Sequence, residues 1–86
     1  MKEKKMIFAI VEVVTYDGGK KAERPLRFVY EGKTYLVAQV IDRWYEGHPV
    51  AGRPNYNYFK VLTTDGEIYI LRYNQRYEVW SMLIKG

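Results

Sequence analysis

The sequence predicts a single all-β domain, a small antiparallel meander of about six strands that is strongly bent into an SH3-like barrel or half-barrel. First, no window has apolar residues at helical spacing with caps at both ends. Second, β-branched and aromatic residues form short runs separated by turn residues, which is typical of antiparallel strands. Third, a chain of 86 residues has interior enough for one core. We therefore expect a flexible charged N-terminal tail over residues 1–5 and one β domain over residues 6–86.

Each predicted strand ends at a turn signal. The six strands are Ile7–Tyr16, Leu26–Tyr30, Lys33–Tyr45, Tyr56–Thr64, Glu67–Tyr73 and Arg76–Ile84. The segments between them are Asp17-Gly18-Gly19 with the polar connector Lys20–Arg24, then Pro25, Glu31-Gly32, the loop Glu46–Asn55, Asp65-Gly66 and Asn74-Gln75. Pro25 suits the first position of a strand because it has no amide to donate.

Turn length decides which side chains share a face of the sheet. A two-residue turn at Glu31-Gly32 sets Phe28 opposite Tyr35, and that face holds Leu26, Phe28, Tyr30, Tyr35, Val37 and Ile41. After strand four, a type I turn with a Gly bulge sets Val61 opposite Tyr69, whereas a tight Asp65-Gly66 turn sets it opposite Ile70. We favour the bulge. With a two-residue turn at Asn74-Gln75, it gathers Phe59, Val61, Tyr69, Leu71, Trp80 and Met82 on one face.

The reverse faces of the sheet are not purely polar. They carry Val29, Leu36, Val40 and Trp44 on strands two and three, and Leu62, Ile68, Ile70, Val79 and Leu83 on strands four to six. A sheet with apolar residues on both sides is not stable alone in water, so it must curl into a barrel, stack on strand one or pair with a second copy. We favour the barrel and leave a homodimer open.

Charge and composition indicate a cytoplasmic protein. The net charge is +4, of which the tail Lys2–Lys5 supplies half. The body has no concentrated basic stripe, so nucleic-acid binding is permitted without being favoured. There is no Cys, and the apolar run behind the tail is too short for a signal peptide or a membrane span. One Ser and two Gln in the whole chain fit a thermophilic source.

The residues offer no catalytic or metal-binding set. Ser81 and His48 are the only Ser and the only His, and they lie in separate predicted elements. One His without Cys does not make a zinc site, and the aspartates are dispersed along the chain. Asp42 and Glu46 are neighbours in sequence, but we expect both to face water. We therefore predict a protein that is not an enzyme and has no metal and no cofactor.

Binding is the chemistry that remains. A tentative ligand- or partner-binding set surrounds the long loop and consists of Trp44, Tyr45, His48, Arg53, Tyr56 and Tyr58, because Tyr and Arg are typical interface anchors. A second set could contact nucleic acid and consists of Arg43, Lys60, Arg72, Arg76 and Tyr77. The simpler interpretation is that the aromatic residues are half-buried strand positions and that the basic ones protect strand edges.

One pattern of aromatic, aliphatic and turn residues resembles a known family. It reads Pro25-x-x-Phe28-x-Tyr30-x-Gly32-x-x-Tyr35-x-Val37, then Val40-x-Asp42-x-Trp44, then Tyr58-Phe59-x-Val61 with Gly66, Tyr69, Leu71 and Trp80. Over residues 25–80 it resembles a family of short uncharacterised bacterial proteins, a domain of unknown function, in which Trp is expected where this chain has Tyr30. Some members of that family are associated with Y-family translesion polymerases. The resemblance implies at most an accessory role in DNA repair, and it carries over no catalytic residue.

These observations lead to three functional hypotheses. The first is a non-enzymatic β-barrel that acts as a protein-interaction or assembly module, with a protein partner or a second copy of itself. The second is a nucleic-acid-binding accessory of DNA repair or replication that binds single-stranded DNA or RNA. The third is a small-ligand-binding protein or a cryptic enzyme. None of the three requires a membrane or a metal.

Overall fold

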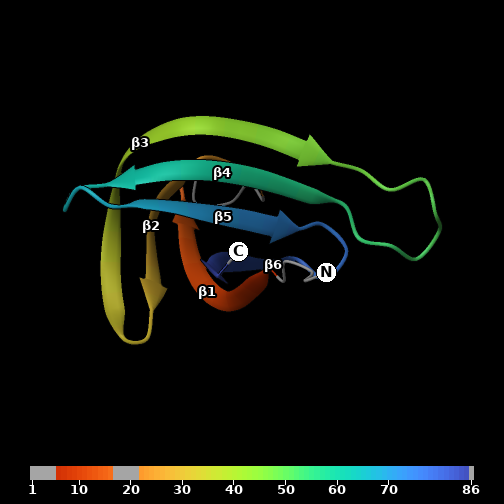
Figure 1. Cartoon of the computed structure of the whole chain (residues 1–86), viewed down its shortest axis with the longest axis horizontal. Coiled ribbons are helices and arrows are strands. Elements are labelled where there is room, and N and C mark those ends of the chain that lie inside the picture. Colours follow the sequence, from red (N-terminus) through yellow and green to blue (C-terminus); the bar gives the residue numbers. More distant parts are fainter. Residues whose placement is uncertain (1–5, 17–21, 86) are drawn as a thin grey trace, which may run out of the picture.

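The computed structural model describes residues 6–16 and 22–85, which form a six-stranded antiparallel barrel (Figure 1). The strands are β1 (Ile7–Thr15), β2 (Pro25–Tyr30), β3 (Lys33–Glu46), β4 (Tyr56–Thr63), β5 (Ile68–Asn74) and β6 (Val79–Lys85). Each strand pairs with the next, and β1 also pairs with β6, so the barrel is closed. The all-β prediction is confirmed. The described part of the chain contains no helix with the length and apolarity that a membrane crossing needs.

One apolar core fills the barrel. Its buried members come from five strands and are Val11, Phe28, Phe59, Val61, Leu71, Tyr73, Trp80 and Met82. Phe28 stacks on Tyr35 with the ring centroids 5.0 Å apart, and Trp80 lies against both Phe59 and Tyr73. Of the core face predicted for strands four to six, every member except the half-buried Tyr69 is buried. Closing the barrel buries side chains of β1, β2, β4, β5 and β6, and Val37 and Val40 of β3 pack against them, which gives a sheet of this size the core it needs to be stable.

Two hairpins have the predicted registers. Phe28 pairs with Tyr35, and Glu31 and Gly32 both have positive φ, as a two-residue turn of the primed type requires. Between β4 and β5, Val61 pairs with Tyr69, and Gly66 has φ +87°. The Gly bulge favoured over the tight turn is therefore confirmed, since only glycine adopts this conformation without strain.

Strand β3 contains two bulges that the sequence did not predict. Its register against β4 shifts between Val37 and Gln39 and again between Val40 and Asp42. Each shift inserts one unpaired residue and reverses the alternation of side chains. As a result Val40 packs against the core and Ile41 is exposed, which corrects the predicted placement of these two side chains. Leu26, also expected in the core, is exposed as well.

The turn between β5 and β6 is longer than predicted. Residues Gln75–Glu78 form it, and the Glu78 amide donates to the Asn74 carbonyl. The Asn74 side-chain oxygen accepts from the amides of Arg76 and Tyr77. Tyr73 therefore pairs with Trp80 and Leu71 with Met82. The predicted two-residue turn at Asn74-Gln75 would instead have set Tyr69 opposite Trp80 and Leu71 opposite Glu78. The register moves by an even number of residues, so the predicted core face survives although its partners change.

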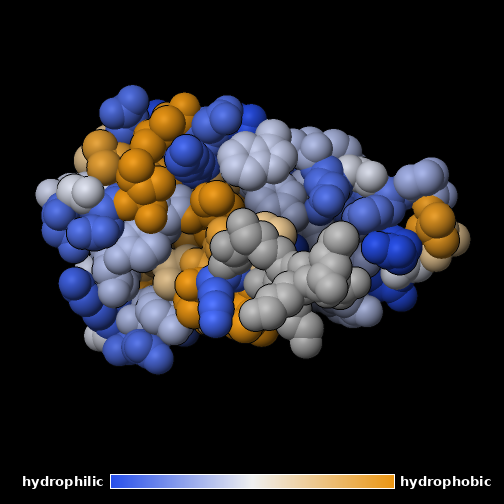
Figure 2. Space-filling view, viewed as in Figure 1, coloured by the Kyte–Doolittle hydropathy of each residue, from blue (hydrophilic) through white to orange (hydrophobic). Residues whose placement is uncertain are grey.

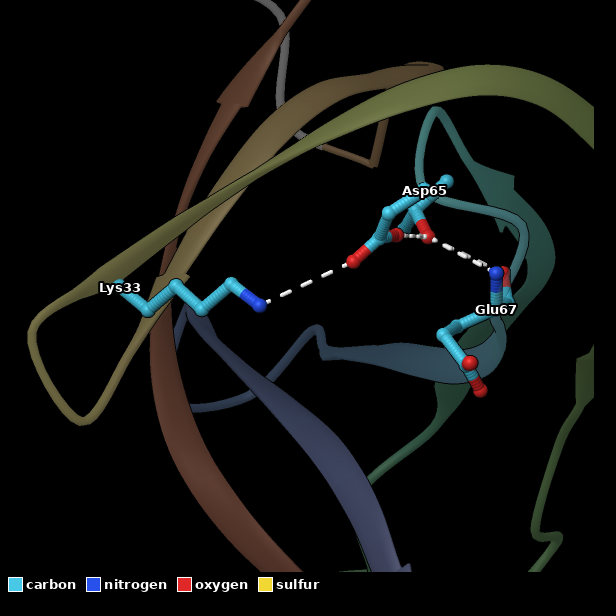
Figure 3. A network of polar contacts seen from close by, with 4 residues as sticks. Lys33, Asp65 and Glu67 are labelled. Carbon is cyan, nitrogen blue, oxygen red and sulfur yellow. Dashed lines mark hydrogen bonds and ion pairs between the residues drawn. The ribbon is translucent and has the colours of Figure 1, made fainter.

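A polar contact joins two turns at one end of the barrel. The Lys33 ammonium lies 3.7 Å from the Asp65 carboxylate, and both side chains are largely exposed (Figure 3). Asp65 also accepts a hydrogen bond from the Thr63 hydroxyl, which contacts the main chain of Glu67. The Thr63 hydrogen bond, helped by Lys33, holds the pKa of Asp65 below its ordinary value. The tail over residues 1–5 and the predicted Asp17-Gly18-Gly19 turn lie outside the described residues.

Candidate functional site

The candidate site lies on the outer wall of the barrel, across strands β3, β4, β5 and β6. Since Phe59 and Val61 point into the core, their neighbours along β4 point outward. Strand pairing aligns four of the outward residues in one row, Trp44, Tyr58, Arg72 and Ser81. We call this row, together with the adjacent Phe8, Glu46 and Tyr56, the outer cluster.

Trp44 and Tyr58 form a stacked pair in the outer cluster. Their ring centroids are 5.1 Å apart and their planes differ by 4°. Tyr58 is only 9% exposed although it points away from the core, because Trp44 and Arg72 cover it on either side. Trp44 itself remains 41% exposed. The pair thus holds a large aromatic face in place and leaves part of it open to solvent.

Arg72 is fixed between two aromatic rings. Its guanidinium carbon lies 3.6 Å from the ring centroid of Phe8 and 4.1 Å from that of Tyr56. It also donates to the Ser81 hydroxyl and, at 3.4 Å, to the Tyr58 hydroxyl. These contacts hold the guanidinium in one position on the outer wall.

Tyr58 links this cation to an acid. Its hydroxyl donates to Glu46 Oε1 at 2.8 Å while it accepts from Arg72. Burial raises the pKa of Tyr58; the Arg72 hydrogen bond opposes that shift and the Glu46 carboxylate adds to it. The phenol therefore stays neutral at physiological pH and serves as a hydrogen-bonding bridge between Glu46 and Arg72.

A groove of about 380 Å³ opens beside the outer cluster. We call it the aromatic groove, and its lining residues are Met6, Phe8, Trp44, Tyr45, Glu46, Tyr58 and Ile70. Only one of them is charged, so the groove offers mainly apolar and aromatic contact with a single carboxylate at its rim. Figure 2 shows further apolar residues at the surface over the left ends of β3 and β4, interleaved with charged ones. Several apolar residues on the strands are exposed, among them Leu36, Ile41 and Ile68.

The first predicted set is divided by the structure. Trp44, Tyr56 and Tyr58 belong to the outer cluster, and Tyr45 lines the aromatic groove. His48 and Arg53 lie in the long loop instead, where the His48 amide donates to Asn55 and the Arg53 amide to Val50. Neither of these two lines the groove.

The second predicted set does not form one surface. Lys60 and Arg72 share the outer wall, but Arg43 lies on the opposite face of β3, where its guanidinium covers the Phe59 ring at 4.9 Å. Arg76 donates to the Gly52 carbonyl at 2.6 Å and so joins the β5–β6 turn to the long loop. Tyr77 was expected on strand six beside Lys60 and Arg72, but it lies in the turn and is 64% exposed.

Sequence reasoning missed the parts of the groove that only barrel closure supplies. Met6 and Phe8 reach it because β1 pairs with β6, and pairing between the first and last strands leaves no local signal in the sequence. Ile70 was placed on the correct face but not recognised as part of a site. Glu46 was taken for a solvated acid. Its position two residues after Trp44 on one strand was the signal that could have joined it to the site.

The described residues offer little other chemistry. No group of three or more His, Asp or Glu side chains within residues 6–16 and 22–85 could hold a metal ion. A second hollow of about 250 Å³ lies where β2 begins and is lined by Arg24, Pro25, Leu26 and residues 37–40 of β3. The aromatic groove is therefore the candidate site that the geometry favours.

Fold and site together define a small closed β-barrel with an aromatic groove on its outer wall. The chain belongs to the family described as a domain of unknown function (DUF6504), whose sequence profile matches residues 2–83. The resemblance to a domain of unknown function is thus confirmed, and it extends over strand one. Neither the curated proteins nor the solved structures include a significant match to this chain.

Proposed function

We propose that this protein is a non-enzymatic protein-interaction module that binds its partner through the aromatic groove. The observation that carries the proposal is the Trp44–Tyr58 stack, in which a partly exposed indole is held against a buried ring. A side chain that is already ordered loses little conformational entropy on binding, so more of its contact area contributes to affinity. Trp and Tyr are also the residue types that most often dominate binding energy at interfaces.

The test compares two aromatic residues at different places on the barrel. Immobilised wild-type protein is used to capture partners from a lysate of the source organism, alongside Trp44→Ala and Tyr77→Ala variants. Both side chains are exposed, but only Trp44 lines the groove. We expect a captured protein that is lost with Trp44→Ala, kept with Tyr77→Ala, and bound again by the purified pair. Equal capture by all three proteins would contradict the proposal.

Self-association is one form of this binding and is measured directly. Size-exclusion chromatography with light scattering gives the mass of the chain over a range of concentrations. A dimer that dissociates in the Trp44→Ala variant would identify a second copy as the partner. A monomer at high concentration would rule out a second copy as the partner.

A single-stranded nucleic acid is the second candidate partner. The observation that favours it is the exposure of Trp44 and Tyr45 beside basic residues, since bases stack on aromatic rings and phosphates bind cations. Two observations make this role the second candidate. Arg72 already contacts Phe8, Tyr56 and Tyr58, so it is less available to a phosphate. Asp42 and Glu46 lie on the same strand as the exposed aromatic residues, and their negative charge would repel a phosphate backbone. A role beside Y-family polymerases, as the family resemblance implies, stays a prediction.

Fluorescence anisotropy with labelled single-stranded oligonucleotides tests the nucleic-acid role. Binding should be measurable at low salt, weaken steeply as salt is added, and weaken further with Trp44→Ala. The absence of binding at low salt would remove this candidate and leave the protein-interaction role untouched.

A further inference from the structure

Among the residues that the structure describes, strand β3 has a paired neighbour on one side only along most of its length. It has 14 residues, but β2 pairs with it only over Lys33–Leu36. Beyond Leu36 the two strands diverge, and the hollow beside Pro25 lies between them. Within residues 6–16 and 22–85, only β4 pairs with the remainder of β3. In Figure 1, β3 is the outermost strand of the arch.

An unpaired edge normally carries protection against association with other strands, such as bulges, prolines or very short length. The two bulges protect the first part of this edge. From Asp42 to Glu46 the register against β4 is regular, and every residue of the segment is exposed. We call Asp42–Glu46 the free edge. It is a regular strand, and one of its main-chain groups already has a partner, since the Arg43 amide donates to the Asp42 carboxylate at 2.8 Å. An added strand would take the place of this local hydrogen bond and release the Asp42 carboxylate for a cation.

The side chains of the free edge alternate in a distinctive order. Asp42, Trp44 and Glu46 share the outer wall, so one face of the strand presents acid, aromatic, acid at intervals of two residues. The Glu46 carboxylate is held in position by the Tyr58 hydroxyl. Residues directly opposite each other on neighbouring strands contact one another, and opposite charges there are favourable. The complementary strand would carry basic, apolar, basic side chains at the same spacing.

We propose that the free edge receives an extended segment of a partner protein with alternating basic, apolar and basic side chains, which adds a strand to the barrel beside β3. This inference rests on the proposed protein-interaction function and specifies its partner. The main chain of the segment bonds the edge, its apolar side chain contacts Trp44 at the aromatic groove, and its two cations face Asp42 and Glu46. Such strand addition is a common mode of peptide recognition.

A second copy of this chain fits the free edge poorly. When two copies of β3 pair antiparallel about a two-fold axis, side chains directly opposite each other lie on the same face of the joined sheet. The residue numbers of each opposite pair therefore differ by an even number. Centring the pair on Arg43 sets two arginines opposite each other. Centring it on Trp44 sets Asp42 opposite the second copy's Glu46. Both arrangements place like charges together, which is unfavourable. Centring the pair on Tyr45 avoids this but sets the second copy's Trp44 opposite Glu46, so neither acid of the free edge receives a Lys or Arg.

The test uses short peptides and amide-resolved NMR. The peptide acetyl-TKTLTKT-amide is titrated into the labelled protein to about 1 mM, a range that detects weak complexes. Its controls are the charge-reversed acetyl-TETLTET-amide and a version N-methylated at alternate residues, which removes main-chain donors. With the basic peptide we expect saturable chemical-shift changes over residues 42–46 and slower hydrogen exchange of the amides there. The acidic peptide should bind roughly fivefold to tenfold more weakly. The N-methylated peptide should not bind.

A charge-swapped protein completes the design. Asp42→Lys with Glu46→Lys should reverse the preference, so that the acidic peptide binds more tightly. Because Glu46 bonds Tyr58, the double variant could unfold. Asp42→Lys alone is therefore the second variant, and it should reduce the preference for the basic peptide without abolishing the fold, which the NMR spectrum reports.

The outcomes separate this inference from the proposed function. If a captured partner depends on Trp44 but leaves the exchange of the Asp42–Glu46 amides unchanged, the strand-addition proposal is wrong and the interaction module stands. If capture does not depend on Trp44 but the peptide protects the edge, the groove proposal fails. No shift and no protection with any peptide would overturn the inference.

Discussion

Tyr58 is a residue on the outside of the barrel that behaves like a core residue. It is nearly buried, donates to Glu46 and accepts from Arg72. Removing the hydroxyl with Tyr58→Phe leaves the ring stack but breaks both contacts, so we expect the free energy of unfolding to fall by about 0.5–1.5 kcal/mol. Urea denaturation measures the loss. Tyr77→Phe is the matched control because its side chain is exposed, and an equal loss in both variants would contradict the assigned role.

Asp65 is the residue at which acid should weaken the fold. Its pKa is lower in the folded protein than in the unfolded chain, mainly because Thr63 donates to the carboxylate. The folded state thus favours the ionised form. The stabilisation is fully present above the ordinary carboxyl pKa of about 4 and is lost as pH falls through the lower folded value. Asp65→Asn should therefore make the free energy of unfolding less dependent on pH in the range below the ordinary carboxyl pKa.

Urea denaturation from neutral to acidic pH measures this dependence. Glu67→Gln is the control, since it removes a carboxylate two residues away while Glu67 contacts Thr63 through its main chain. If both substitutions reduce the acid dependence equally, then general charge repulsion rather than the Asp65 contact is responsible. If neither does, the contact contributes nothing measurable.

At the scale of the element, β3 shows how a bulge determines whether a side chain faces the core or the solvent. Val40 packs against the core and Ile41 is exposed, opposite to simple alternation from Val37. Val40→Ala should therefore lower the free energy of unfolding by about 1–2 kcal/mol, since it leaves a space in the core. Ile41→Ala should change it by less than about 0.5 kcal/mol. Urea denaturation of the two variants measures both changes. A larger loss of unfolding free energy for Ile41→Ala than for Val40→Ala would contradict the positions of the bulges.

The elements also show what the sequence could and could not predict. Turns with a local conformational requirement were predictable, because Gly32 and Gly66 adopt positive φ and fix the registers beside them. The β5–β6 turn was not, because the Asn74 side chain supports a longer turn than its dipeptide signal indicates. The bulges of β3 have no such signal. They arise where one strand leaves β2 and bends along β4.

At the scale of the whole molecule, one core joins all the strands, so the barrel should unfold as a unit. The two tryptophans make this testable because Trp80 lies in the core and Trp44 on the outer wall. In a Trp44→Phe variant, fluorescence reports Trp80 alone, while far-UV circular dichroism reports the whole sheet. We expect coincident urea transitions from the two signals, as two-state unfolding requires. Separate midpoints would show that part of the barrel unfolds independently.

Closure also limits what could be predicted about the site. The aromatic residues of β3 and β4 were predicted because they lie close together in the sequence around one loop. Phe8 and Arg72 belong to the same cluster, at 3.6 Å, although most of the chain separates them. Their contact depends on β1 meeting β6, a pairing between the two ends of the domain that no local pattern encodes.

The two bulges of β3 have a consequence for how this strand can change in length. A bulge takes up one extra residue and leaves the residues after it opposite the same partners, so Trp44 still lies opposite Tyr58 although this stretch of chain is two residues longer than a regular ladder needs. Deleting Ala38, Ile41 or both would therefore remove a bulge and make the ladder regular, while the Trp44 indole stays on the outer wall and the Arg43 guanidinium on the inner one. Changes in the length of this strand are compatible with the groove wherever a bulge takes them up.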